Sequence, residues 1–227
     1  MPLPLDHYRV AILSFGENRT YLNNLSQEAF DYINVTQTLK AVERFRHISD
    51  FVVVFGSSEL WSRCTGPINV ETPISYFNNP YTRSKHRLVT SIREKSYRNV
   101  HLIHPFNFNT RYRTGDFLFG KIYGSILTRS RVVLGDTYFY RDLVTASDIV
   151  NSCINPSVSE CIVGSGRLFH VNEVIRELYR SVGLEYDDYV SENINSISIR
   201  RQYPYFAAHG TGCDTLDWMK RDLSNAL

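Results

Sequence analysis

A continuous apolar run from Phe51 to Phe55 is the clearest hydrophobic pattern in the chain. Such a run is typical of a strand that is buried on both faces of a parallel sheet. The segment that follows, Gly56 to Trp61, begins with small hydroxyl residues and carries a carboxylate, Glu59. Open α/β sheets bind ligands at the carboxyl ends of their strands, so this pattern predicts a candidate site directly after the strand.

A second pattern predicts a helix that begins at Pro80, which suits a first-turn position, and ends near Tyr97. Its apolar positions recur at helical spacing: Leu88, Val89 and Ile92. Tyr81 and Lys85 share one face of this helix because they are four residues apart. A cation beside a phenol lowers the tyrosine pKa, and such a phenol can take a proton from a sugar hydroxyl. A solvated helix face with a half-buried tyrosine is the alternative interpretation.

Other segments show weaker patterns of the same two kinds. Short β-prone stretches predict strands at residues 8–15, 100–104, 132–135 and 161–163. Helical periodicity predicts helices at residues 26–45, 116–128, 171–182 and 215–223, with Ser26 as the N-cap of the first.

Composition narrows the class of protein. The 227 residues fit one domain with a small second lobe, and hydrophobic residues make up 43%. A net charge of +2 without a basic run gives no argument for nucleic acid or membrane binding. Four cysteines without a Cys-x-x-Cys pair indicate reduced thiols of a cytoplasmic protein, with no metal site. Residues 1–6 show no secretory signal, and no apolar run approaches the length of a membrane span.

Four motifs occur in an order and at a spacing that point to a known family. They are Val54 to Trp61, Asn79 to Lys85, Pro105-Phe106-Asn107, and Tyr140 to Val144 with Asp148. With them the chain resembles the extended short-chain dehydrogenases/reductases, the NAD-dependent nucleotide-sugar epimerases and dehydratases. Ser57-Ser58-Glu59-Leu60-Trp61 looks most like the Ser/Thr-x-Glu-Leu-Tyr motif of hexose 4,6-dehydratases such as GDP-mannose 4,6-dehydratase.

The resemblance implies an α/β fold, a truncated Rossmann-like parallel sheet with a small C-terminal substrate lobe. Residues 1–106 would form the partial Rossmann-like core, and residues 107–227 would be mostly substrate-lobe elements interleaved with it. Family members open with a strand, a Gly-x-x-Gly-x-x-Gly turn and a helix, which this sequence does not contain. Gly164-Ser165-Gly166 does not replace that turn, because Phe169 stands where a third glycine is needed. The family comparison places the whole stretch from Cys161 to Gly166 in the substrate lobe.

The resemblance also implies site residues and a cofactor, NAD or NADP. Tyr81 would deprotonate the sugar O4, Lys85 would hold the cofactor ribose and keep the phenol acidic, and Ser57 would bind the O4 oxygen. Glu59 would remove the C5 proton of a dehydratase substrate; a solvent-exposed loop glutamate is the alternative. Residues implied to contact the cofactor are Ser14, Phe15, Gly16, Tyr81, Lys85 and Pro105. Residues implied to bind the nucleotide sugar are Asn107, Arg111, Arg113 and Arg141.

Some positions keep two interpretations. Asn34 is either the structural asparagine of the family or a helix-surface amide. Arg141 either reaches a phosphate or forms a structural pair with Asp142. His101 and His104 are expected to be strand residues with hydrogen-bonded rings, because no third ligand at a metal-site spacing accompanies them.

Three functions remain open at the level of sequence. The chain is a dehydratase or epimerase that needs a further nucleotide-binding half or partner, a non-catalytic nucleotide-sugar-binding protein, or a structural or assembly protein that kept the fold. The strand at Tyr8 to Phe15 is expected to lie at a sheet edge, since the family strand that pairs with it is not in the sequence. A second copy, a partner chain or a terminal segment of the chain is expected to cover this edge.

Overall fold

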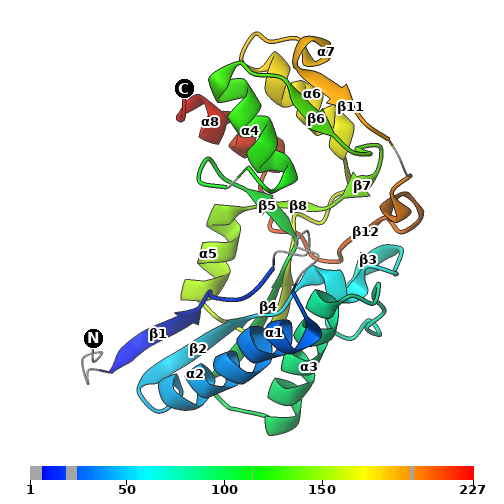
Figure 1. Cartoon of the computed structure of the whole chain (residues 1–227). Coiled ribbons are helices and arrows are strands. Elements are labelled where there is room, and N and C mark those ends of the chain that lie inside the picture. The colour runs from blue at the N-terminus through cyan, green and yellow to red at the C-terminus, as the bar shows by residue number, and fades with distance from the viewer. Residues whose placement is uncertain (1–6, 19–24, 114, 195–196) are drawn as a thin grey trace. The chain divides into compact units, whose positions relative to one another are not determined.

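The computed structural model describes residues 7–18, 25–113, 115–194 and 197–227 (Figure 1). Residues 1–6, on which the expectation about a secretory signal rests, lie outside these ranges. The chain divides into two compact units. Unit 1 comprises the described residues of Met1–Arg63, Val70–Pro105 and Val150–Val163, and unit 2 those of Cys64–Asn69, Phe106–Ile149 and Gly164–Leu227.

Unit 1 is built on a four-stranded parallel sheet. Its order is β1 (Tyr8–Leu13), β2 (Ser49–Phe55), β4 (Val100–Pro105) and β9 (Glu160–Val163). The β2 residues Val52 to Val54 are fully buried, as the apolar run predicts. The predicted fold class, α/β with a Rossmann-like parallel sheet, is confirmed. The expectation for residues 161–166 is corrected in its first half: Cys161 to Val163 belong to β9, which pairs with β4 in this central sheet, whereas Gly164 to Gly166 lie in unit 2.

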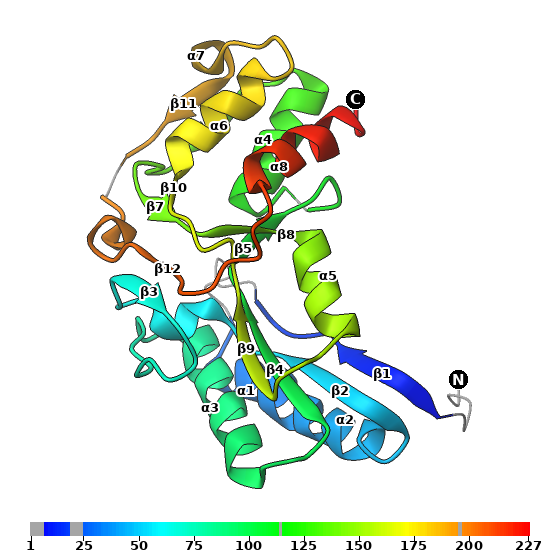
Figure 2. The same ribbon diagram turned by 180° about the vertical axis from the view of Figure 1, so that it is seen from behind.

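Helices α1, α2 and α3 lie on one side of the unit 1 sheet (Figures 1 and 2). The predicted helix at 26–45 is three consecutive helical segments, α1 (Gln27–Asp31), the π-helix η1 (Tyr32–Gln37) and α2 (Thr38–Phe45). The Ser26 side chain accepts a hydrogen bond from the Ala29 amide, as expected of an N-cap. α3 (Pro80–Lys95) begins with a reciprocal capping box between Asn79 and Thr82, which fixes where Tyr81 and Lys85 lie along the helix.

Strand β1 has an open side in the described part of the chain. Its ladder there pairs it with β2 alone, so one row of backbone groups faces away from the sheet. Ile12 on this strand is 42% exposed, and Phe15 just after it is 44% exposed. Apolar side chains beside unpaired strand groups are a typical site of association between chains.

The described residues of unit 2 form four two-stranded sheets and most of the remaining helices. Its parallel pairs are β5 (Asn107–Asn109) with β8 (Leu143–Thr145), β6 (Val132–Leu134) with β11 (Val190–Glu192), and β3 (Gly66–Ile68) with β12 (Tyr205–Ala207). The antiparallel pair is β7 (Tyr140–Arg141) with β10 (Phe169–His170). The helices are α4 (Leu118–Thr128), α6 (Val171–Arg180), α7 (Tyr186–Tyr189) and α8 (Thr215–Ser224), with 3-10 helix η3 at Ile199–Gln202. α5 (Ala146–Ile154) has residues in both units.

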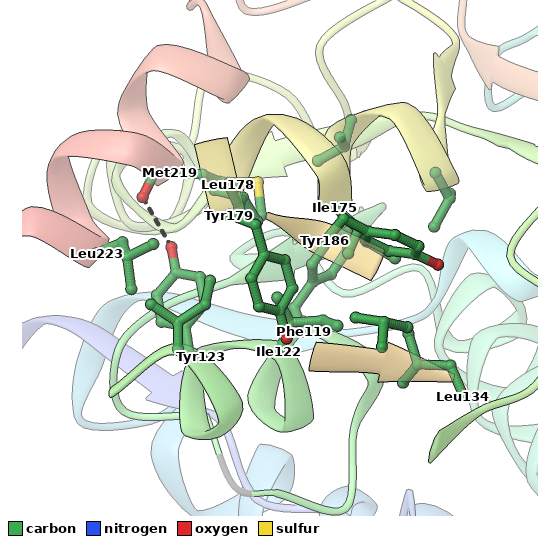
Figure 3. Packing of buried hydrophobic residues seen from close by; sticks show 14 of the residues in the cluster. Phe119, Ile122, Tyr123, Leu134, Ile175, Leu178, Tyr179, Tyr186, Met219 and Leu223 are labelled. Atoms are coloured by element: carbon green, nitrogen blue, oxygen red, sulfur yellow. Dashed lines mark hydrogen bonds between the residues drawn. The ribbon is translucent and has the colours of Figure 1, made fainter. Parts of the chain in front are cut away.

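Helices α4, α6 and α8 bring their apolar faces together in the core of unit 2 (Figure 3). Ile122, Ile175 and Leu178 are fully buried there. The Tyr123 hydroxyl donates to the Met219 carbonyl oxygen over 2.8 Å, so the one polar atom of this ring is satisfied inside the core. Among the described residues, no helix is both long and apolar enough to cross a membrane.

Candidate functional site

The candidate site of unit 1 begins where β2 ends. The Gly56 amide donates to the Ile103 carbonyl of β4 over 2.8 Å, and Ser57 then becomes the N-cap of a 3-10 helix, η2 (Ser58–Trp61). The Ser57 Oγ accepts a hydrogen bond of 3.2 Å from the Glu59 amide. Within the described part of the chain the Ser57 hydroxyl proton has no acceptor, so the hydroxyl can donate this proton to a ligand.

Lys85 ties helix α3 to the same end of β2. Its side chain is buried, and its Nζ donates to the Phe55 carbonyl oxygen over 2.8 Å. Burial lowers the pKa of Lys85 from 10.5 to about 8. The Nζ lies 6.0 Å from the centre of the half-buried Tyr81 ring, one helical turn earlier. The ammonium therefore lies over the Tyr81 ring and at the carboxyl end of the strand that leads to Ser57.

Asn34 connects the turn after β1 to helix α3. Its Oδ1 accepts from the Glu17 amide over 2.7 Å, and its Nδ2 donates to the Glu17 carbonyl and the Ser84 Oγ, each over 2.9 Å. The residue is fully buried, which excludes a helix-surface amide and supports a structural one. A Cβ at Gly16 would lie 3.1 Å from the Asn34 Oδ1 and 3.8 Å from the Lys85 Nζ. Asn34 thus holds the Gly16 backbone next to Lys85.

We expect Asn34→Ala to lower the free energy of unfolding by about 3 kcal/mol, because it removes the hydrogen bonds that Asn34 makes with the buried Glu17 amide and carbonyl and with Ser84. Denaturant unfolding followed by tryptophan fluorescence measures this difference. Asn155→Ala is the control, since Asn155 is exposed and shows only a backbone hydrogen bond among the described residues. Equal stability of the two variants would contradict the structural role of Asn34.

The remaining residues implied to contact a cofactor also lie in unit 1. Ser14 and Phe15 follow β1 and are exposed, and Pro105 is the last residue of β4. Because β1, β2 and β4 are adjacent parallel strands, these residues and the Ser57 turn lie at the carboxyl ends of neighbouring strands. This is the edge at which open α/β sheets bind ligands.

The residues implied to bind the nucleotide sugar all lie in unit 2. Asn107 is exposed on β5 and pairs in register with Leu143. The backbone amide of Arg111 donates to the Asp222 carboxylate over 2.6 Å, and its guanidinium to the Asn225 carbonyl over 3.3 Å. Arg113 stacks on an aromatic ring, with its guanidinium carbon 3.9 Å from the centre of Phe117.

Arg141 and Asp142 are both buried. The Arg141 guanidinium carbon lies 4.9 Å from the centre of the Tyr205 ring, a cation–π distance. The Asp142 Oδ1 accepts from the amide and hydroxyl of Ser165 over 2.8 and 2.6 Å, and its Oδ2 from the amides of Gly166 and Ala207 over 3.1 and 3.0 Å. Burial raises the pKa of Asp142, and these donors oppose the rise. Asp142 therefore joins three separate segments of unit 2.

The structure brings one predicted group of residues together and shows one neighbour that sequence reasoning missed. Lys85, Tyr81 and the Ser57–Glu59 segment gather at the carboxyl end of β2, with Gly16 beside them. His104 is the missed residue: its ring is hydrogen bonded, as predicted, and one of its two partners is the amide of Ser57, at 3.2 Å. Only the chain fold shows this contact, since the two residues are 47 positions apart.

Comparison with known proteins places the fold. No protein-family model matches the sequence, and no curated protein matches it. The structure of RMD from Pseudomonas aeruginosa with NADPH matches with a TM-score of 0.79 at 16% identity, over 96% of this chain and 82% of that chain. A dTDP-glucose 4,6-dehydratase from Bacillus anthracis with NAD gives 0.70 at 18%, over 96% and 73%. A UDP-glucose 4-epimerase from Thermotoga maritima with UDP-glucose gives 0.76 at 14%, over 96% and 78%. The chain therefore shares the fold of these three proteins.

Proposed function

We propose that the chain takes part in NAD- or NADP-dependent modification of a nucleotide hexose, most like a 4,6-dehydratase, with its proton-transfer groups in unit 1. The observation that carries this proposal is the position of Lys85. Its buried ammonium stands beside the Tyr81 ring and holds the Phe55 carbonyl at the strand end that leads to Ser57 and Glu59. The matched structures bound to NADPH, NAD and UDP-glucose support the class of cofactor and substrate.

The residues of unit 1 suit the nicotinamide end of a dinucleotide. Because Gly16 has no side chain, the space next to the Lys85 ammonium stays open to a ligand. The Lys85 ammonium is a donor that could hold a ribose hydroxyl. Ser14, Phe15 and Pro105 would line the same edge of the sheet. A bound NAD or NADP would supply a hydride acceptor that later returns the hydride.

The chain's own groups then have separate roles in proton transfer. Tyr81 takes the proton of the sugar O4, and the Lys85 ammonium keeps the phenol acidic. The Ser57 hydroxyl donates to the O4 oxygen as it becomes a carbonyl. Glu59 takes the proton of C5, which the 4-keto group acidifies, and passes it to the departing O6 hydroxyl. The net reaction removes one water from the hexose and leaves a 4-keto-6-deoxy sugar.

The test is incubation of the chain with millimolar NAD or NADP and a panel of nucleotide hexoses, followed by mass spectrometry. Loss of one water from one member of the panel supports the proposal. Binding of a nucleotide sugar without conversion would favour the non-catalytic binding protein instead. If the folded chain neither binds nor converts any nucleotide sugar, and conversion is also absent when a partner chain supplies the nucleotide-binding half, a structural or assembly role is favoured.

We expect the 227-residue chain by itself to bind NAD weakly, with a dissociation constant well above micromolar. In dinucleotide-binding folds, Gly-rich backbone amides at a helix N-terminus hold the pyrophosphate. The sequence contains no Gly-x-x-Gly-x-x-Gly turn. Each lost charge-assisted hydrogen bond weakens binding by about 1.5–3 kcal/mol. Calorimetric titration measures the affinity, and micromolar or tighter binding would show that another surface holds the pyrophosphate.

We further propose that a second copy of the chain pairs with β1. Antiparallel pairing of two β1 strands about Ala11 would place each Arg9 opposite a Leu13, so no like charges would face each other. Ile12→Lys puts a charge on this exposed edge and is expected to shift light scattering from dimer to monomer. Leu127→Lys, on α4 of unit 2 with 38% exposure, is the control and should leave the dimer intact. A wild-type monomer with fast amide exchange at Val10 to Leu13 would contradict the proposal.

A further inference from the structure

The turn Phe55–Gly56–Ser57 is held from two sides. The Lys85 ammonium binds the carbonyl of Phe55, before the turn, over 2.8 Å. The His104 Nδ1 accepts from the amide of Ser57, after the turn, over 3.2 Å. We propose that His104 is the positioning residue of this site, and that an Arg93–Glu160 pair behind it keeps its ring in the state that can accept from Ser57. The importance of Ser57 for sugar binding rests on the proposed function, whereas the positioning itself does not.

The hydrogen bonds define one tautomer of His104. A backbone amide is always a donor, so the Nδ1 that receives the Ser57 proton carries none itself. The remaining proton is then on Nε2, which lies 2.7 Å from the Glu160 Oε1 and donates to it. If Nδ1 were protonated, it and the Ser57 amide would be two donors facing each other, with no acceptor between them. Burial lowers the pKa of His104, while Glu160 opposes this effect, so the ring stays neutral at physiological pH.

Arg93 fixes the carboxylate that selects this tautomer. Its Nε and Nη2 donate to the two Glu160 oxygens over 2.9 and 2.7 Å, a bidentate arrangement. Burial raises the pKa of Glu160, but the hydrogen bonds of His104 and Arg93 outweigh it and bring the pKa to about 2. Glu160 is therefore a permanent acceptor for the Nε2 proton. The chain of contacts runs from Arg93 on α3 through Glu160 on β9 and His104 on β4 to Ser57.

The residues packed around the His104 ring fix its position. The residue is fully buried, and a Cβ on Gly56 would lie only 2.2 Å from its Nδ1, so the ring occupies the space that glycine provides. The Trp61 ring of η2 packs edge-on against it, with centroids 5.1 Å apart and planes at 89°. The His104 ring thus contacts both Ser57, which precedes η2, and Trp61, which is the last residue of η2.

The consequence concerns Ser57 and Glu59 together. Since the Ser57 Oγ accepts from the Glu59 amide, the position of the Ser57 backbone sets where both side chains begin. His104 itself is too buried to touch a substrate, so its effect on chemistry goes through these two residues. Loss of the Nδ1 acceptor would leave the buried Ser57 amide without a partner and allow the turn to move.

Two substitutions distinguish the role of the His104 Nδ1 as an acceptor from the role of its Nε2 as a donor. The Oδ1 of His104→Asn can replace Nδ1 as the acceptor for Ser57, whereas His104→Gln retains a donor for Glu160 and loses that acceptor. We expect Ser57 amide exchange to rise about tenfold in His104→Gln and to remain near the wild-type rate in His104→Asn. His101→Gln is the matched control, because His101 lies on the same strand and its Nδ1 contacts the Val158 carbonyl oxygen, at 2.6 Å.

The tautomer is read directly from nitrogen NMR of the wild-type ring, which remains informative if a variant fails to fold. A protonated Nε2 with an unprotonated Nδ1 supports the proposal, and a protonated Nδ1 overturns it. Equal Ser57 exchange in His104→Gln and His104→Asn would overturn it as well. These measurements need no ligand, so a failure of the proposed function leaves their outcome unchanged.

Discussion

Replacing Lys85 with methionine should lower nucleotide-sugar turnover by about 10²–10⁴-fold, the range that general acid–base catalysis contributes. The substitution removes the cation that stands 6.0 Å from the Tyr81 ring centre and that, in the proposed mechanism, favours the phenolate. It also leaves the Phe55 carbonyl without the Lys85 hydrogen bond. Turnover of the wild type and the variant, measured with saturating cofactor, checks this expectation.

Lys95→Met is the control because Lys95 is the last residue of the same helix and its side chain is 46% exposed. Its turnover should stay within about twofold of the wild type, as most exposed substitutions have small effects. Similar losses in both variants would mean that Lys85 acts only through the stability of α3.

The same variant gives a pH test that needs no substrate. The pKa of Lys85 is about 8 in the folded chain and 10.5 when exposed, so between these values the unfolded chain binds more protons. The wild type should therefore gain stability as pH rises through this window, by about 3 kcal/mol in total. Lys85→Met should lack this gain. If the stability of the wild type and of the variant changes in parallel with pH, the pKa of Lys85 is not lowered in the folded chain.

Replacing Asp142 with alanine should lower the free energy of unfolding of unit 2 by about 4 kcal/mol. The change leaves the amides of Ser165, Gly166 and Ala207 without their acceptor, at about 1–3 kcal/mol for each buried donor. Fluorine NMR of fluorotryptophan-labelled protein measures it, because Trp218 reports on unit 2 and Trp61 on unit 1. The Trp218 signal should unfold at lower denaturant concentration than in the wild type.

Asp116→Ala is the matched control, since Asp116 is an exposed aspartate of unit 2. Its unfolding midpoint should stay at the wild-type value. If Asp142→Ala also leaves the Trp218 midpoint unchanged, the three segments are joined by other contacts.

Local patterns predict the elements that hold the site. The run at Phe51 to Phe55 predicts β2 because a strand covered on both faces has no polar side to show. Asn79 and Pro80 mark the start of α3 because both act within the first helical turn. The π-helix η1 was not predicted, because the expected helical spacing does not reveal a wider local turn.

Contacts between distant residues limit what the sequence can tell. Asn34 meets Glu17 and Ser84, which are 17 and 50 positions away, so its buried role follows only from the fold. His104 reads as a strand residue, and its partner Glu160 is 56 positions away. The strand at β9 was predicted, but its place in the central sheet depends on pairing with β4.

The most direct test of the central claim, that unit 1 carries the groups of a hexose dehydratase, is the product formed by Glu59→Gln. Wild-type chain with saturating cofactor should convert its nucleotide hexose to a product lighter by one water. Glu59→Gln should still oxidise C4, because Tyr81, Lys85 and Ser57 are intact, but it should retain the O6 hydroxyl, which mass spectrometry detects. Loss of water at the wild-type rate in Glu59→Gln would contradict the assignment.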